Sequence, residues 1–91
     1  MRYFTTDAYE KRFKTFPSNR KKKIKKAVAL AVAFFETGNL PQGLGMKPMG
    51  LGIWEIRAGL SDRVLFQKSR DVVEFILVGN HDEIRRYLKN L

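Results

Sequence analysis

The sequence has no cysteine, a single histidine and a single tryptophan among its 91 residues. Without cysteine there can be no disulfide bond, no thiol catalysis and no cysteine-rich zinc site. The lone histidine and the scattered acidic residues show no metal-ligand spacing, which disfavours a zinc site built by the protein alone. We therefore expect no metal centre.

Long hydrophobic runs are also missing. The longest apolar stretch, 27–35, follows five lysines and falls well short of the roughly 20 residues that cross a bilayer. The amino-terminal segment contains Asp7 and Glu10 and does not have the pattern of a secretory signal. We expect a cytoplasmic protein without a membrane segment.

Negative charge is scarce. Lysine and arginine total 18 against 9 acidic residues, for a net charge of +9 and an isoelectric point near 10.2. A field of this sign attracts polyanions at long range and is typical of nucleic-acid-binding domains. A merely soluble basic surface, or an acidic protein partner that masks the charge, is compatible with the same numbers.

A chain of this length predicts one domain, residues 1–91. Residues 2–5 have the composition of a short strand. Thr6 or Asp7 is suited to cap a helix over 8–16, which Pro17 ends. Ser18 is then suited to cap a second helix that runs to about Thr37 and is stopped by Gly38, so the two helices form a tight αα-hairpin.

The second helix has two unlike halves. Residues 27–35 are apolar nearly all round and are expected to be buried on most sides. The first turns must project into solvent or onto an anion, because a lysine cluster cannot be buried. This cluster consists of Arg20, Lys21, Lys22, Lys23, Lys25 and Lys26.

The carboxyl-terminal half reads as β structure. Two prolines and four glycines predict a loop over 39–52. Strands are then predicted over 53–58, 63–68 and 72–78, the last of them broken by Gly79. Asn80 and Glu83 form the pattern of a capping box for a final helix. The fold class is α+β, in the order β-α-α-β-β-β with a short carboxyl-terminal helix.

The first two of these strands form a hairpin whose register can be deduced. If Ala58 faces Asp62, then Arg57 faces Arg63, and strand alternation separates two sets of side chains. One set is apolar and suited to a core: Trp54, Ile56, Val64 and Phe66. The other set is mostly polar: Glu55, Arg57, Arg63 and Leu65.

Opposed arginines in a hairpin are chemically informative. Directly facing Cβ atoms lie about 5 Å apart, so two guanidinium groups there repel unless an anion such as phosphate lies between them. The alternative is that Glu55 neutralises them in an ion-pair network. His81 follows the last strand at the start of the final helix, and histidine suits proton transfer near neutrality; otherwise it is a polar residue at a helix cap.

Three segments resemble the RelE/ParE superfamily of type II toxins: 52–57 (GIWEIR), 62–66 (DRVLF) and 78–84 (VGNHDEI). Lys47 with Met49 resembles the Lys-x-Leu pattern that commonly precedes the family hairpin. Asp62 stands where the family commonly has tyrosine. The likeness extends over essentially the whole chain and implies a curved antiparallel sheet packed on the amino-terminal helical hairpin.

In the RNA-cleaving branch, the resemblance implies a toxin that enters the ribosomal A site and cuts messenger RNA by attack of a ribose 2′-hydroxyl on the adjacent phosphate. No metal or cofactor is implied. Arg57 and Arg63 match arginines that stabilise the phosphate, His81 falls at the position of the proton donor, and Glu55 is a candidate general base or a structural residue. The candidate RNA-binding residues are Lys21, Lys22, Lys23, Lys25, Lys26, Lys47 and Arg85.

The partners implied are messenger RNA, the ribosome and an antitoxin protein that places an acidic or amphipathic segment over the basic sheet or along the helices. Two other functions remain open. One is a non-enzymatic inhibitor of DNA gyrase, as in the ParE branch. The other is a plain RNA- or ribosome-binding module without chemistry.

Overall fold

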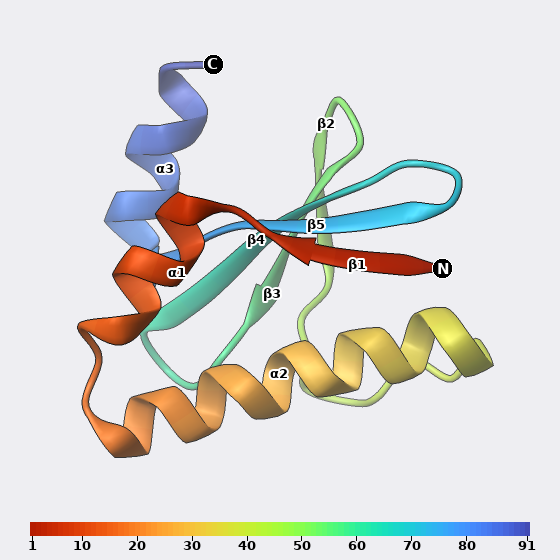
Figure 1. Cartoon of the computed structure of the whole chain (residues 1–91), viewed down its shortest axis with the longest axis horizontal. Coiled ribbons are helices and arrows are strands. Elements are labelled where there is room, and N and C mark those ends of the chain that lie inside the picture. Colours follow the sequence, from red (N-terminus) through yellow and green to blue (C-terminus); the bar gives the residue numbers. More distant parts are fainter.

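The computed structural model describes residues 1–91 and confirms the α+β class and the predicted order of helices and strands (Figure 1). One further strand, β2, precedes the predicted hairpin. The elements are β1 (Arg2–Thr5), α1 (Asp7–Lys14), α2 (Ser18–Thr37), β2 (Lys47–Gly50), β3 (Ile53–Arg57), β4 (Asp62–Lys68), β5 (Val72–Asn80) and α3 (His81–Lys89).

The five strands form one mixed sheet in the order β1-β5-β4-β3-β2. The strands from β2 to β5 are antiparallel, whereas β1 joins the edge of the sheet parallel to β5. The sheet is therefore not wholly antiparallel as the resemblance implied. The parallel pair needs a crossover connection, and the path from β1 to β5 passes through α1, α2 and the other three strands.

The prediction of an unbroken loop over 39–52 is wrong at β2. This strand contains Pro48 and ends in an irregular turn where Gly50, Leu51 and Gly52 have positive φ. Proline cannot donate a ladder hydrogen bond and is confined to edge strands, which is where β2 lies. The loop was predicted from composition alone, in which these turn-forming residues are typical of loops.

Gly79 does not break the last strand as predicted; β5 continues through it to Asn80. A Cβ atom at Gly79 would lie 2.9 Å from the carboxyl carbon of Glu83. The glycine therefore lets a carboxylate of α3 approach the backbone of β5, which is a common reason for glycine inside a strand. The capping box between Asn80 and Glu83 is confirmed.

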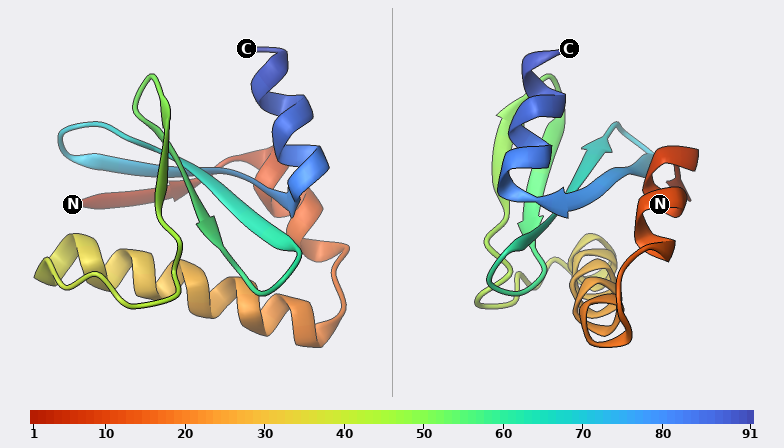
Figure 2. Two further views of the ribbon diagram at one scale, coloured as in Figure 1. Left: turned by 180° about the vertical axis from the view of Figure 1, so that it is seen from behind. Right: turned by 90° about the vertical axis from the view of Figure 1, so that its left-hand side faces the viewer.

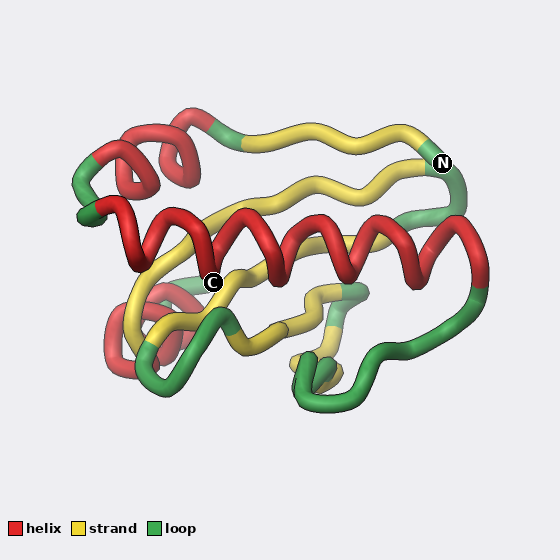
Figure 3. The backbone as a smooth tube through the Cα atoms, turned by 90° about the horizontal axis from the view of Figure 1, so that it is seen from below, coloured by secondary structure: helices red, strands yellow, loops and turns green.

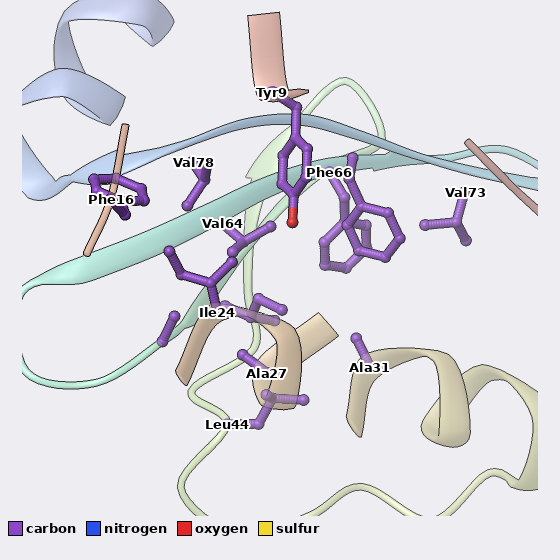
Figure 4. Close-up of a cluster of buried hydrophobic side chains, with 13 residues drawn as sticks. Tyr9, Phe16, Ile24, Ala27, Ala31, Leu44, Val64, Phe66, Val73 and Val78 are labelled. Carbon is purple, nitrogen blue, oxygen red and sulfur yellow. The ribbon is translucent and has the colours of Figure 1, made fainter. Parts of the chain in front are cut away.

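The helix α2 lies across one face of the sheet (Figure 3), and no other element covers its outer side. Ile24, Ala27 and Ala31 face the core and are buried, as the close-up of the core shows (Figure 4). Ala29 and Ala33 are exposed. The expectation that 27–35 is buried on most sides is therefore wrong, because a helix packed on one face of a two-layer fold keeps an outer side.

The hairpin register is confirmed: Arg57 pairs with Arg63, Ile56 with Val64 and Trp54 with Phe66. The apolar set belongs to the main core under α2. Phe66 is fully buried, and its ring lies 5.6 Å from that of Phe35 on α2 in an edge-on arrangement. Aromatic pairs of this geometry contribute about 0.5–1.5 kcal/mol beyond their buried area.

The opposite face of the sheet is covered in part by α3 (Figure 2). Ile84 is fully buried against Leu65 and Ile53, with Tyr87 and Leu88 packed around them. None of the three helices combines the length and hydrophobicity required to span a bilayer.

Two bidentate ion pairs lie around Phe16, one between two helices and one between a helix and the sheet. Arg12 donates to both carboxylate oxygens of Glu83 at 2.7 and 2.8 Å, and Arg20 donates to both of Asp62 at 2.6 and 2.9 Å. The two guanidinium groups lie 4.4 and 4.3 Å from the centre of the Phe16 ring. The ring and the two pairs together fix α1 to α3 and α2 to β4.

The Arg12–Glu83 pair predicts a pH-dependent stability. The hydrogen bond from Arg12 lowers the pKa of the Glu83 carboxyl below its ordinary value. Such a group stabilises the fold above its unfolded pKa, and the contribution is lost as pH falls through the folded value. Glu83→Gln keeps a capping-box side chain but removes the charge. It should lower the melting temperature at neutral pH, and the difference from wild type should shrink below roughly pH 4.3.

Thermal unfolding followed by circular dichroism across this pH range tests the prediction. The exposed Glu36, which forms no ion pair, provides a control as Glu36→Gln. A Glu83→Gln deficit that stayed constant from neutral to acid pH would show that the charge of Glu83 is not its source.

Candidate functional site

The predicted catalytic residues lie at one end of the sheet. Arg57 at the end of β3 pairs with Arg63 near the start of β4, and Arg63 pairs in turn with Gly79 near the end of β5. His81, the first residue of α3, follows two residues after Gly79. Paired residues of neighbouring strands point to the same face, so the two arginines emerge on the face that α3 partly covers.

Arg63 is held by carboxylate and backbone groups. Its side chain is 16% exposed, and its Nε lies 3.6 Å from Oε1 of Glu55, whose side chain is 10% exposed. Its Nη1 donates to the backbone oxygen of Asp62 at 3.0 Å. The separation from Glu55 is that of an ion pair rather than a hydrogen bond. Glu55 therefore neutralises Arg63, as the alternative interpretation of the hairpin expected, but not Arg57.

Arg57 is exposed and forms none of the ion pairs of the chain. Its backbone N–H donates to the carbonyl of Leu44 at 2.8 Å, which attaches the loop before β2 to the end of β3. Its side chain lies over Gly45, where an added Cβ would meet its Cδ at 2.9 Å. One arginine of the opposed pair is thus fixed by a carboxylate, and the other is an uncompensated cation over a glycine.

Lys47 lies in the added edge strand, opposite Glu55. The row of side chains across β2, β3 and β4 therefore reads Lys47, Glu55 and Leu65. Glu55 thus faces Lys47 across the strands and lies 3.6 Å from the Nε of Arg63. The sequence placed Lys47 in a loop and gave no indication of this pairing.

His81 is exposed at the first turn of α3, after Asn80 caps the helix. The helix amino terminus carries a partial positive charge. The imidazole of His81 forms no hydrogen bond or ion pair with another side chain. Across the whole chain there is no group of three His, Asp or Glu side chains placed to hold a metal ion.

The predicted RNA-binding lysines of α2 do not lie together on one side. The ammonium groups of Lys21 and Lys25 lie 5.8 and 5.9 Å from the Phe13 ring of α1. Lys23 lies over Gly59 in the turn between β3 and β4, on the opposite side of the helix. The basic cluster is therefore divided between α1 and the arginine end of the sheet.

Arg85 is separate from both groups. It lies on the exposed side of α3, where it lines a shallow hollow with Asp82, Arg86 and Lys89. The structure thus brings together Arg57, Arg63 and Glu55 near His81, with Lys23 and Lys47 at the borders of this end of the sheet. It leaves Lys21, Lys25 and Arg85 elsewhere.

The position of the Arg57 side chain should depend on the glycine at position 45. Gly38→Ala and Gly45→Ala both place alanine at positive φ, at a cost of about 1–2 kcal/mol. Only the methyl group at position 45 collides with Arg57, because nothing lies within 4 Å at position 38. The Arg57 Nε–Hε resonance should shift in Gly45→Ala and stay in place in Gly38→Ala, as read by heteronuclear NMR. Equal spectra would mean that Arg57 does not rest on this glycine.

No family model matches the sequence, and no curated protein matches it significantly. Solved structures match it closely in shape. YafQ from E. coli strain BL21(DE3) superposes with a TM-score of 0.76 at 16% identity, over 92% of this chain and 98% of that one. A chain of the RelB–RelE antitoxin–toxin complex from Methanococcus jannaschii matches with a TM-score of 0.69 at 20% identity, over 92% and 96%.

A third structure, the YoeB/ParE toxin from Agrobacterium tumefaciens, matches with a TM-score of 0.67 at 18% identity, over 89% of this chain and 99% of that one. At these identities the likeness concerns the fold rather than the chemistry of the site. Each match spans nearly the whole of both chains. The protein therefore has the fold of the RelE/ParE superfamily of toxins.

Proposed function

We propose that this chain is the toxin of a type II toxin–antitoxin pair and that it cleaves messenger RNA on the ribosome. The observation that supports this most is the row formed by Arg57, Arg63 and Gly79, with His81 at the same end of the sheet. It occurs in a chain with a net charge of +9 and the fold of RelE and YafQ, which were solved in toxin–antitoxin complexes.

The chemistry follows from these groups. The ribose 2′-oxygen attacks the adjacent phosphorus, the P–O5′ bond breaks, and a 2′,3′-cyclic phosphate remains. Arg63 and Arg57 stabilise the negative charge that grows on the phosphate oxygens, a role for which fixed guanidinium groups are suited. His81 gives a proton to the leaving 5′-oxygen, the general-acid role that histidine fills most often in enzymes.

Glu55 takes one of two roles. As general base it accepts the proton of the 2′-hydroxyl; as a positioning residue it keeps Arg63 directed at the phosphate. The 3.6 Å ion pair with Arg63 favours the positioning role. In that role the proton of the 2′-hydroxyl passes to water as the new P–O2′ bond forms.

An antitoxin partner belongs to this proposal. The RelE fold was solved in complex with the antitoxin RelB. In this chain, an apolar groove of about 570 Å³ lies between α2 and β3, lined by Phe34, Phe35, Leu40, Met46 and Trp54 with Lys68 at its border. Leu40 is 56% exposed there. The apolar floor and basic border fit an acidic amphipathic segment of the antitoxin.

For this partner, affinity capture from the native host should return a small acidic protein that suppresses toxicity. Leu40→Glu should weaken its binding, because a carboxylate replaces the exposed apolar side chain. Capture that returned no such protein, or binding unaffected by Leu40→Glu, would contradict this assignment of the groove.

The catalytic assignment is tested by primer extension on a translated message after induction. Arg63→Ala and His81→Ala should each reduce cleavage, Arg63→Ala by about 10²–10³-fold, which is the usual effect of removing one group that stabilises a developing oxyanion. Arg63→Lys keeps a positive partner for Glu55 and should also be defective, because lysine lacks the planar fork. Arg70→Ala, an exposed site with the same charge change, serves as the control.

Circular dichroism must show that each variant is folded. Wild-type cleavage by Arg63→Ala would remove the proposed centre. Absence of cleavage in the wild type, with poisoning in a gyrase supercoiling assay, would favour the ParE-like alternative. Binding of transcripts without any cut would favour the plain RNA-binding module.

A further inference from the structure

A second cationic feature lies beside the arginine row, on the side of α2. A cavity of about 230 Å³ opens where α2, the loop before β2 and the turn between β3 and β4 meet. Its walls include Lys23 and Lys26 from α2. Arg57, which leaves β3 on the opposite face of the sheet, also borders the cavity because it lies at the end of that strand. The turn contributes Gly59, and the loop contributes Gly43.

The cavity carries positive charge without compensation. No acidic residue lines it, and the three ion pairs of the chain, Arg12–Glu83, Arg20–Asp62 and Arg63–Glu55, all lie elsewhere. Lys23 and Lys26 are three residues apart and share a helix face, where like charges destabilise the helix. A bound anion would relieve this repulsion.

The glycine in the wall of the cavity lets a side chain approach the backbone closely. Gly59 has a φ of +103°, and a Cβ there would lie 3.2 Å from Cδ and 4.0 Å from Nζ of Lys23. The lysine stem therefore lies across a bare backbone. The hydrogen bond from Arg57 N to Leu44 O fixes the loop against β3, so the cavity exists without a ligand.

The size of the cavity restricts its occupant. Pockets for drug-sized ligands measure about 300–1,000 Å³, and this one is smaller. The cavity offers three cationic donors, Lys23, Lys26 and Arg57, between glycine walls. These donors suit the oxygens of one phosphate group. A cationic ligand has no partner here, because no acidic side chain lines the cavity.

We infer that this cavity binds one phosphodiester of an RNA backbone, next to the site of cleavage. The inference rests on the proposed function for the identity of the nucleic acid, and it gives Lys23 and Lys26 a role separate from the other lysines of α2. Arg57 belongs to both the cavity and the row with Arg63, so it links the two phosphate positions. The RNA backbone passes around the β3–β4 turn, from the phosphate in the cavity to the phosphate beside Arg63.

The test measures binding without cleavage. Heteronuclear NMR follows the backbone amides of Gly43 and Gly59 as inorganic phosphate is added at constant ionic strength, and then as an all-deoxy oligonucleotide is added. The deoxy strand has no 2′-hydroxyl and cannot be cut by the proposed reaction, so a failure of catalysis does not affect the readout. Both ligands should shift these amides saturably and compete with each other.

The matched variants lie on one helix. Lys26→Gln should abolish the saturable shifts of Gly43 and Gly59. For overall binding of the oligonucleotide, it should lower the slope of log affinity against log salt by about 0.7, the value for one phosphate contact of a single strand. Lys22→Gln makes the same charge change one turn away, at an exposed residue outside the cavity, and should keep the shifts.

Three results would overturn the inference. One is the absence of a saturable shift with either ligand. Another is a shift with inorganic phosphate alone, which would make the cavity a site for a free anion. The third is an equal loss of binding in Lys22→Gln and Lys26→Gln, which would mean that only the general charge of α2 matters.

Discussion

The pairing of β3 with β4 is the constraint on which the core and the site both depend. Its register directs Ile56 and Val64 toward α2 and their neighbours Arg57 and Arg63 toward the opposite face. A slip of one residue would exchange the two sets, burying guanidinium groups and exposing the core. The free energy that favours apolar burial under α2 therefore also holds the two arginines opposite each other. The proposed chemistry requires no additional device to bring them together.

The few carboxylates of the chain decide which cations remain free. Asp62, Glu83 and Glu55 engage Arg20, Arg12 and Arg63, and the first two of these pairs fasten the helices around Phe16. These ion pairs use part of the positive charge to stabilise the fold. Among the cations outside these three pairs, Arg57, Lys23 and Lys26 line one cavity at the end of the sheet. A polyanion is the ligand that this remainder attracts.

The fold leaves exposed apolar surface as well as exposed charge. No further element packs on the outer side of α2, which stays exposed, and the groove at Leu40 extends that surface. At identities of 16–20% with toxins of this shape, most side chains differ although the arrangement of the layers is the same. The fold is therefore compatible with many sequences, and a function must be argued from the local surfaces.

The strand 2–5, the limits of α2, the hairpin register and the capping box of α3 follow from the sequence, because strand alternation, proline and glycine stops and capping residues act over short distances. The opposed arginines could be predicted for the same reason. Only the tertiary structure decided that Asp62 receives Arg20, that Gly79 makes room for Glu83, that 47–50 becomes an edge strand, and that Lys23 and Lys26 meet Arg57 at a cavity. Each of these joins residues far apart in the chain, and such contacts depend on how the layers pack rather than on any local pattern.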